Sequence, residues 1–339
     1  MRTPSSILRF MIGTALAVAG AAGAQPPPAE LRVVSYNLYN YFEMAKQPQV
    51  KSPESRRMTE AILADLNPDV ALVVETGGRG AAEELRAALK ARGRDYPFLS
   101  VVEGEDPERR LAVLAKWLPE TVAHDTAATY NLGLNVVRVQ RGFAHVVFRW
   151  DNGYRLHIIG AHLKSKLFDP RGQTDMRRYE ARLLRALATT ILEADATANI
   201  LILGDFNDAP NSSPLNTLIN RRTTPDKQLY DLRPVDPQGN SWTHLYDGED
   251  AYTRIDYAIA SRSLLPEVRL AKTVIPAYAD WYIASDHRPL LVVLDPRDRP
   301  PAPDDLKPFE RNIRVQDPPV SFFSEGRVIG SRKARKPAP

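Results

Sequence analysis

The sequence predicts an α/β fold, a four-layer sandwich in which two packed, mixed β-sheets are flanked by helices. Over residues 31–295, short apolar runs of strand length alternate with longer amphipathic segments of helix length. Asn152-Gly153 joins two apolar runs, a spacing typical of a β-hairpin and therefore of antiparallel neighbours. Strand-helix units together with hairpins favour two sheets packed face to face, with the helices outside.

Two helices and six strands are expected between residues 31 and 150. Ser52-Pro53-Glu54 begins the first helix, because serine caps a helix and proline suits its first turn. This helix ends at Asn67-Pro68-Asp69, and a second helix covers about residues 81–91. The expected strands are 31–37, 70–74, 98–102, 111–117, 136–139 and 143–150.

The strongest helix signal in the chain lies between residues 174 and 192. Its apolar residues recur at three- and four-residue spacing and are expected to form one buried face: Met176, Tyr179, Leu183, Leu187 and Ile191. Residues 154–161 complete the hairpin. The remaining strands are expected at 200–203, 254–260 and 290–294, so that one domain covers residues 31–295.

The N-terminal segment has the features of a targeting signal. Arg2 and Arg9 lie in a basic start, followed by an apolar stretch that ends in small residues, which predicts a signal peptide over residues 1–24. A membrane anchor is the alternative, but the stretch is short and rich in Gly and Ala. We therefore expect cleavage near Ala24, a secreted or periplasmic protein, and no stable membrane anchor after cleavage.

The composition is that of a globular protein whose positive charge lies outside the domain. Hydrophobic residues make up 43% and charged residues 25% of the 339 residues. Residues 25–30 form a Pro-rich spacer, and residues 296–339 form a Pro-rich, charged tail. The net charge of the chain is +4, but the tail carries +4 and residues 1–30 carry +1, which leaves the domain near −1. A nucleic acid would have to be bound by a local basic strip or by the tail.

Two polar clusters stand where an apolar strand meets a loop. Gly204-Asp205-Phe206-Asn207 follows one strand, and Ser285-Asp286-His287 precedes another. Together they supply oxygen ligands for a divalent ion, a base for a water, and donors for the charge on phosphoryl oxygens. Metal-assisted hydrolysis of phosphate esters requires all three. The absence of cysteine excludes thiol nucleophiles and thiolate zinc sites.

Further motifs follow one another along the chain and complete a pattern. They are Ser35-Tyr36-Asn37, Val73-Val74-Glu75-Thr76, Gly160-Ala161-His162-Leu163 and Arg254-Ile255-Asp256-Tyr257. Each motif alone is compatible with an ordinary turn or strand end. With the two clusters, and in this order, the set resembles the endonuclease/exonuclease/phosphatase superfamily, whose fold is that of DNase I. The variant Ala161–Lys166 is similar to that of exported bacterial nucleases.

The resemblance implies a set of catalytic roles. Asp205 or His287 would take the proton from the attacking water, and Asp256 would orient His287 through its other ring nitrogen. Asn207 and His162 would donate to the phosphoryl oxygens. The residues expected to be catalytic are therefore His162, Asp205, Asn207, Asp256 and His287.

The resemblance also implies a metal site. The expected ligands are Asn37, Glu75 and Asp286, and the expected ion is Mg²⁺, with Mn²⁺ or Ca²⁺ as alternatives. Asp286 would hold a second ion or a water, although Tyr39 and Asn40 stand where some members carry another acid. The remaining histidines are assigned to packing or to solvent: His124, His145, His157 and His244.

The leading functional hypothesis is an exported nuclease that acts on DNA or RNA with little sequence specificity. Lys164 and Lys166 follow His162, and Arg178, Arg182 and Arg185 lie on the next helix. Such residues are solvated in most helices, but here Lys164, Lys166 and Arg178 are expected to bind phosphates. The enzyme alternative is a phosphodiesterase or phosphatase of lipid head groups or sugar phosphates, with Trp281-Tyr282 as its candidate aromatic loop. The other alternative is a degenerate binding module, and a monomer is expected.

Overall fold

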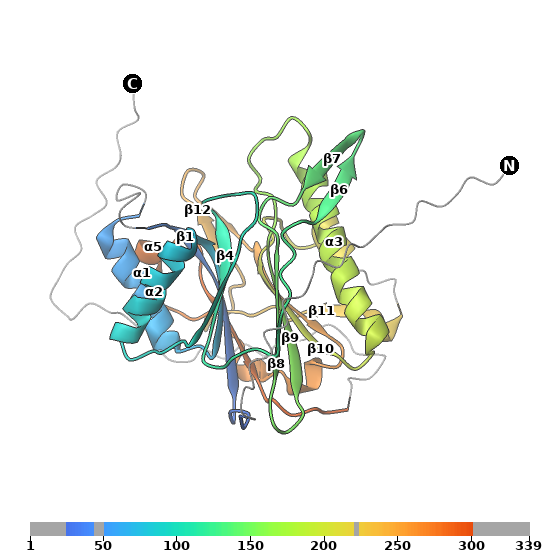
Figure 1. Cartoon of the computed structure of the whole chain (residues 1–339). Coiled ribbons are helices and arrows are strands. Elements are labelled where there is room, and N and C mark those ends of the chain that lie inside the picture. Colours follow the sequence, from blue (N-terminus) through green and yellow to red (C-terminus); the bar gives the residue numbers. More distant parts are fainter. Residues whose placement is uncertain (1–24, 44–50, 220–223, 301–339) are drawn as a thin grey trace.

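The fold class predicted from the sequence is confirmed. The computed structural model describes residues 25–43, 51–219 and 224–300, and shows two mixed β-sheets flanked by helices (Figure 1). The predicted signal peptide and residues 301–339 of the predicted tail lie outside the described residues. In the part that is described, no helix is long and apolar enough to cross a membrane.

The first sheet contains five strands in the order β15-β1-β2-β4-β3. Strands β1 and β2 run parallel, and the other neighbours are antiparallel. Hydrophobic residues fill these strands on both faces, as expected for a sheet that is covered on both sides. The strands are β1 (Leu31–Tyr41), β2 (Val70–Thr76), β3 (Phe98–Val102), β4 (Arg110–Ala115) and β15 (Leu290–Leu294).

The second sheet contains six strands in the order β11-β14-β10-β9-β8-β5. Here β9 and β10 run parallel, while β8 and β9 form the predicted hairpin around Asn152-Gly153. The strands are β5 (Thr121–Val122), β8 (Phe143–Arg149), β9 (Arg155–His162), β10 (Asn199–Asp205), β11 (Leu229–Asp231) and β14 (Asp256–Ser261).

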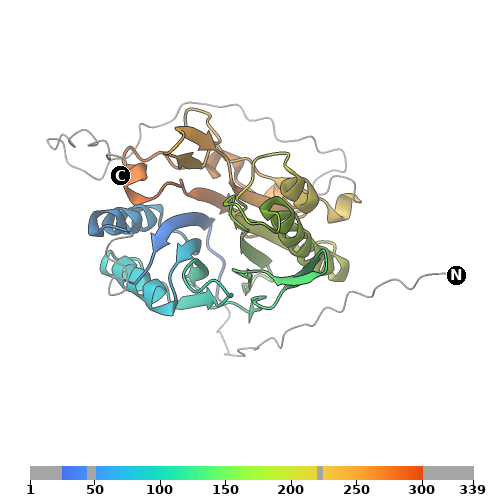
Figure 2. The same ribbon diagram turned by 90° about the horizontal axis from the view of Figure 1, so that it is seen from above.

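Helices cover the outer faces of both sheets. Seen from above, α1 (Pro53–Leu66) and α2 (Arg79–Ala91) lie on one side of the sandwich, and α3 (Gln173–Ala194) lies on the other (Figure 2). The helix α4 (Ser213–Ile219) packs against α3, and the short α5 (Trp281–Ala284) packs against α1. The central core between the sheets contains residues from both, among them Leu72, Val113, Val146, Ile158, Leu203 and Ala258.

Two small hairpins lie outside the main sheets. They are β6 (Thr129–Leu132) with β7 (Asn135–Arg138), and β12 (His244–Tyr246) with β13 (Ala251–Thr253). The predicted strand 136–139 thus belongs to an isolated hairpin. The predicted strand 254–260 begins two residues later, because Arg254 and Ile255 form the connection from β13 to β14.

The long helix α3 is present, but its buried face is rotated from the predicted one. Met176 is buried, whereas Tyr179 and the three later aliphatic residues are only partly buried. The face against the sheet is centred on small and aliphatic residues, since alanine lets a helix approach a sheet closely: Ala181, Leu184, Ala188 and Leu192. Arg185, expected on the solvated stripe, is buried and donates to the carbonyls of Leu218 and Lys227.

Candidate active site

Three predicted catalytic residues occupy paired positions on neighbouring strands. Asp205 is the last residue of β10, and its partners in register are His162 on β9 and Asp256 on β14. Paired residues on adjacent strands point to the same face and lie about 5 Å apart, so sheet pairing itself places these three side chains together. All three are buried.

The residue before Asp205 has to be glycine. Gly204 has a φ of 136°, and a Cβ atom there would lie 1.9 Å from the carbonyl oxygen of Ala161. A side chain would therefore push β10 away from β9 next to the Asp205 carboxylate. The Gly204-Asp205 pair is explained by this close approach as well as by the chemistry of the carboxylate.

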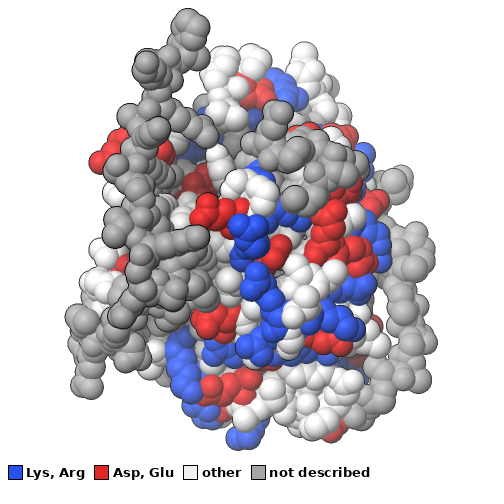
Figure 3. Space-filling model, turned by 90° about the vertical axis from the view of Figure 1, so that its left-hand side faces the viewer, with Lys and Arg blue, Asp and Glu red and all other residues white. Residues whose placement is uncertain are grey.

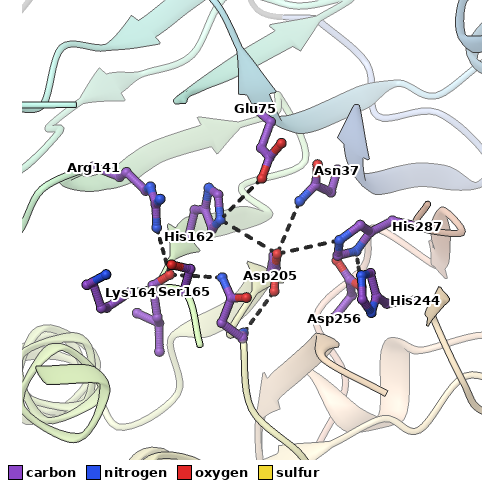
Figure 4. Close-up of polar contacts among 12 residues, drawn as sticks. Asn37, Glu75, Arg141, His162, Lys164, Ser165, Asp205, His244, Asp256 and His287 are labelled. Atoms are coloured by element: carbon purple, nitrogen blue, oxygen red, sulfur yellow. Dashed lines mark hydrogen bonds and ion pairs between the residues drawn. The ribbon is translucent and has the colours of Figure 1, made fainter. Parts of the chain in front are cut away.

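Asn37 and Glu75 come from the other sheet and reach the same centre. The side-chain nitrogen of Asn37 donates to Asp205 Oδ2 at 3.1 Å (Figure 4). The backbone nitrogen of Asn40 donates to Glu75 Oε2 at 3.1 Å, and Glu75 Oε1 lies 3.8 Å from His162 Nε2. Asn40 and Glu75 both have positive φ angles, 56° and 59°. Backbone strain of this kind is concentrated at functional sites.

His287 is held by hydrogen bonds to its backbone and to its ring. Its backbone nitrogen donates to Ser285 Oγ at 3.0 Å, and Ser285 Oγ donates to the carbonyl of Asn37 at 2.8 Å. On the ring, Nδ1 lies 2.8 Å from Asp256 Oδ2. Nε2 lies 3.8 Å from Asp205 Oδ2, so the contact of Nδ1 with Asp256 leaves Nε2 as the nitrogen that can meet a substrate.

The Nε2 atoms of two histidines lie near one carboxylate oxygen. Asp205 Oδ2 lies 3.6 Å from His162 Nε2 and 3.8 Å from His287 Nε2 (Figure 4). These distances are too long for direct hydrogen bonds, so Asp205 Oδ2 lies between the two rings without a direct bond to either.

The buried charges shift one another's proton affinities. Burial opposes the charged imidazolium of His287, but its hydrogen-bonded partner Asp256, together with Asp205 and Asp286, outweighs burial and raises the pKa of His287. Burial, and then the charge of Asp256, raise the pKa of Asp205. Burial, and then the charge of Arg141, lower the pKa of His162 well below its ordinary value.

The donor set fits a divalent cation. Four carboxylates approach the site with one imidazolium among them, so a bound cation would relieve their repulsion: Glu75, Asp205, Asp256 and Asp286. Two groups have ligand atoms within 4.8 Å of one another, Asp205 with Asp256 and His287, and His244 with Asp286 and His287. Of the predicted ligands, Glu75 lies beside His162 and Asp286 lies beside His244. The Asn37 oxygen accepts from Tyr39 N at 3.0 Å.

Asn207 holds the loop after His162. Its side-chain nitrogen donates to the carbonyl of Leu163 at 3.0 Å, and its backbone nitrogen donates to Asp205 Oδ1 at 2.8 Å. One of its two amide hydrogens is therefore already used, which gives Asn207 a positioning contact that the sequence did not predict. Arg141, also not predicted, donates to the same Leu163 carbonyl at 2.9 Å.

The three basic residues predicted to bind phosphates differ in their element, exposure and ion pairing. Lys164 and Lys166 lie on the loop directly after His162, Lys164 half-buried and Lys166 exposed. Arg178 is exposed on α3, but it pairs with Asp175 at 2.9 Å, so part of its charge is already neutralised. Two residues of α3 fix the backbone of this loop. Glu180 Oε2 accepts from Lys164 N at 2.7 Å, and Arg177 donates to the carbonyl of Ser165 at 3.0 Å.

His244 is the nearest residue that the sequence did not assign to the site. It was expected in packing or solvent, but its ring lies 4.6 Å from that of His287, and its Nε2 lies 3.8 Å from Asp286 Oδ2. A lone histidine in a short hairpin carries no local signal of such a role. Only the backbone pairing of β12 with the segment around His287 brings the two rings together.

Comparison with known proteins agrees with this geometry. Residues 34–287 match the model of the Endonuclease/Exonuclease/phosphatase family. A search of the curated proteins found no match to the sequence.

Solved structures share the fold at low sequence identity. An endonuclease/exonuclease/phosphatase from Bacteroides vulgatus is 17% identical, with a TM-score of 0.56, over 80% of this chain and 100% of that chain. Sphingomyelinase C from Streptomyces griseocarneus is 19% identical, with a TM-score of 0.54, over 79% and 100%. Truncated TDP2 from Caenorhabditis elegans is 15% identical, with a TM-score of 0.53, over 78% and 97%. The neighbours include different substrate classes, so they establish the fold and not the substrate.

Proposed function

Since this chain belongs to the endonuclease/exonuclease/phosphatase family of phosphoric ester hydrolases, we propose that it is a divalent-metal-dependent nuclease. It cleaves the backbone of DNA, and also of RNA, with little sequence specificity. The observation that carries this proposal is the loop that joins the catalytic strand β9 to α3. Lys164 and Lys166 on this loop lie next to a buried phosphoesterase site.

The lysine loop is defined as residues 163–172, between β9 and α3. Its backbone is fixed, and Lys164 and Lys166 on it can bind an anion. Glu180 and Arg177 fix its backbone. In the described part of the chain no carboxylate forms an ion pair with Lys164 or Lys166, in contrast to Arg178. Burial, and then the charge of His287, lower the pKa of His244 on the β12–β13 hairpin, and the charge of Lys166 adds to this shift. A polyanion that follows these lysines would be led into the catalytic centre.

The outer face of the first sheet has a different charge pattern. Figure 3 shows this side of the molecule, where acidic side chains lie beside basic ones. Many of them are paired, including Arg86 with Glu83 at 2.5 Å and Arg56 with Glu84 at 2.9 Å. The alternation of charges on α1 and α2 favours a solvated surface, and leaves the lysine loop as the better phosphate-binding element.

Each residue of the site has a chemical task in the proposed reaction. His162 and His287 present Nε2 to a phosphoryl oxygen, and Asp205 lies between them to align the attacking water. Asp256 keeps the ring of His287 oriented. A bound divalent cation would supply charge neutralisation at the phosphoryl oxygens, and Glu75 is placed to hold it.

Export is part of the proposal. The predicted signal peptide, residues 1–24, and a domain without cysteine are compatible with a secreted or periplasmic monomer that needs no disulfide. N-terminal sequencing of the protein recovered from the culture medium or periplasm should find a chain that begins at Gln25.

A panel of substrates tests the function. Plasmid, single-stranded DNA, RNA, sphingomyelin and bis-p-nitrophenyl phosphate should be incubated with the protein and Mg²⁺, Mn²⁺, Ca²⁺ or a chelator. We expect cleavage of polynucleotides that requires a divalent ion and is lost in His287→Ala. Hydrolysis of sphingomyelin without cleavage of any polynucleotide would overturn the proposal, and full activity of His287→Ala would remove His287 from the site.

A second candidate function is the hydrolysis of phospholipid head groups. It is favoured by exposed apolar residues on two neighbouring elements, the β6–β7 hairpin and the loop before α3: Leu134, Val136, Leu167 and Phe168. Exposed apolar residues beside lysines are typical of surfaces that bind a membrane. The sequence pointed instead to Trp281-Tyr282, where Tyr282 is exposed but Trp281 packs against Trp242.

A further inference from the structure

The β12–β13 hairpin forms a wall of the site on the side of His287. Backbone bonds attach it to the catalytic segment, since Leu245 N donates to the carbonyl of Asp286 at 2.9 Å and Arg288 N donates to that of Thr243 at 2.6 Å. His244 and His287 form an antiparallel bridge. The hairpin is therefore held as an additional strand beside the residues that carry the chemistry.

The two faces of this hairpin have different surroundings. In its register His244 pairs with Thr253, Leu245 with Tyr252, and Tyr246 with Ala251. Since side chains alternate along a strand, His244 and Tyr246 share one face and Tyr252 lies on the other. The His244 face is the one toward the site, because the rings of His244 and His287 lie 4.6 Å apart (Figure 4). His244 Nε2 also lies 3.8 Å from Asp286 Oδ2.

Tyr246 lies one pleat beyond His244, about 7 Å further along the strand. Duplex DNA advances about 3.4 Å per nucleotide on each strand, so this position is within about two nucleotides of a phosphate at the catalytic centre. The Tyr246 ring is 53% exposed. The side chain lies near Gly248, with three of its atoms 3.4–3.6 Å from the position that a Cβ would take there. An exposed aromatic ring at this distance from the site can stack on a base.

The charges around the β12–β13 hairpin determine whether a phosphate or a base of a nucleic acid lies against the Tyr246 ring. The turn of the hairpin is acidic and exposed: Asp247, Glu249 and Asp250. These carboxylates repel phosphates and an anionic membrane alike. The lysines of the opposite wall, Lys164 and Lys166, attract phosphates. A strand with its phosphates toward the lysines turns its bases toward the hairpin.

We propose that Tyr246 is a nucleobase-binding residue, which stacks on an unpaired base beside the phosphate that is cleaved. The inference rests on the proposed nuclease function and specifies the form of the substrate. A base inside a duplex is already stacked on both sides, so the Tyr246 ring accepts a base from a single strand or an open end. The enzyme therefore prefers unpaired nucleotides, through base stacking and not through base identity.

The test compares two tyrosines of the same hairpin. Binding is measured by fluorescence anisotropy in an Asp205→Asn background, which prevents cleavage. One labelled strand is oligothymidylate, and the other has equal length and equal phosphates but abasic nucleotides throughout. The variants are Tyr246→Ala, Tyr246→Phe and Tyr252→Ala. Tyr252 is the matched control, because it is equally exposed at 54% but lies on the opposite face.

We expect the base-bearing strand to bind about 5- to 150-fold more tightly than the abasic strand, the range of one aromatic stacking contact. Tyr246→Ala should abolish this difference, while Tyr246→Phe and Tyr252→Ala keep it. Because Phe retains the ring, it also shows that the position tolerates substitution.

The inference is overturned if the protein with an unmodified hairpin binds the two strands equally. It is also overturned if Tyr246→Ala and Tyr252→Ala lose the same amount of affinity for the base-bearing strand. A third contrary result is binding to phosphatidylcholine vesicles that depends on both tyrosines. The last would assign the hairpin to a lipid surface. If polynucleotides are cleaved but the two strands bind equally, only this inference fails. If no polynucleotide is cleaved, the proposed function fails first.

Discussion

Ser285 Oγ donates a hydrogen bond of 2.8 Å to the carbonyl of Asn37, across 248 residues of sequence. The same hydroxyl accepts from the backbone nitrogen of His287 at 3.0 Å. One buried side chain thus joins the first strand to the turn that carries His287. The serine of the Ser285-Asp286-His287 motif therefore holds the position of His287.

Ser285→Ala is expected to lower kcat about 10- to 100-fold with a smaller change in KM, because His287 loses its fixed position while phosphate contacts remain. The free energy of unfolding should fall by about 1–3 kcal/mol, since two buried groups lose their partner. Steady-state kinetics on bis-p-nitrophenyl phosphate and denaturant unfolding measure both. Ser285→Thr keeps the hydroxyl and should recover part of the activity; an equally impaired threonine variant would mean that the hydroxyl is not the cause.

Asp256→Asn should lower kcat by about 10²- to 10⁴-fold, because an amide neither stabilises the imidazolium of His287 nor fixes its tautomer. Removal of this negative charge also lowers the pKa of His287, which NMR titration of the ring can follow. The control is Asp250→Asn, an exposed carboxylate on the β12–β13 turn. Unchanged kcat in Asp256→Asn would contradict the orienting role.

Glu75→Gln tests the predicted cation site. A neutral amide binds divalent ions more weakly than a carboxylate, so we expect at least about a tenfold increase in the Mg²⁺ concentration for half-maximal activity. Calorimetric titration with Mg²⁺ gives a second measure that does not depend on turnover. A chelator should abolish activity in the unmodified protein, and activity that survives chelation would exclude the metal-dependent mechanism.

Replacing both Lys164 and Lys166 by Ala should weaken DNA binding and flatten its salt dependence. Each lost contact with a phosphate of duplex DNA lowers the slope of log K against log[salt] by about 0.9, so the double variant should lose about 1.8. Lys90→Ala is the control, since Lys90 is an exposed lysine on α2, away from the site. An unchanged slope would show that the loop does not contact the backbone.

The free energy of unfolding is expected to depend on pH through Glu267, which lies away from the active site, and Glu267→Gln tests this. Glu267 is buried and its Oε2 lies 2.6 Å from Tyr154 Oη, which donates to it. Burial raises the pKa of Glu267 to about 8. The folded protein then keeps this proton between about pH 4.5 and 8 while the unfolded chain releases it, so stability falls as pH rises through this range.

An amide in place of the Glu267 carboxyl cannot ionise, so Glu267→Gln should be more stable than the unmodified protein at pH 9 by up to about 5 kcal/mol, and similar to it at pH 5. Thermal unfolding at the two pH values measures the difference. A stabilisation that is the same at both pH values would show that the pKa of Glu267 is not raised.

Much of the fold and of the site could be predicted from local sequence. The apolar runs and caps located the strands and helices, and the ordered motifs located residues that the structure brings together around Asp205. The rotation of α3 and the burial of Arg185 could not be predicted, because they depend on which face of the helix meets the sheet. The same holds for Asn207, whose amide is partly used by the Leu163 carbonyl.

The sequence by itself determined the architecture and the kind of chemistry. Apolar periodicity is a local property, and carboxylates and imidazoles at strand ends carry their reactivity with them. Only the tertiary structure decided which groups meet: the pairing of Asp205 with Asp256, the approach of His244 to His287, and the face on which Tyr246 stands. These contacts depend on register between distant strands, where a shift of one residue turns every side chain to the opposite face.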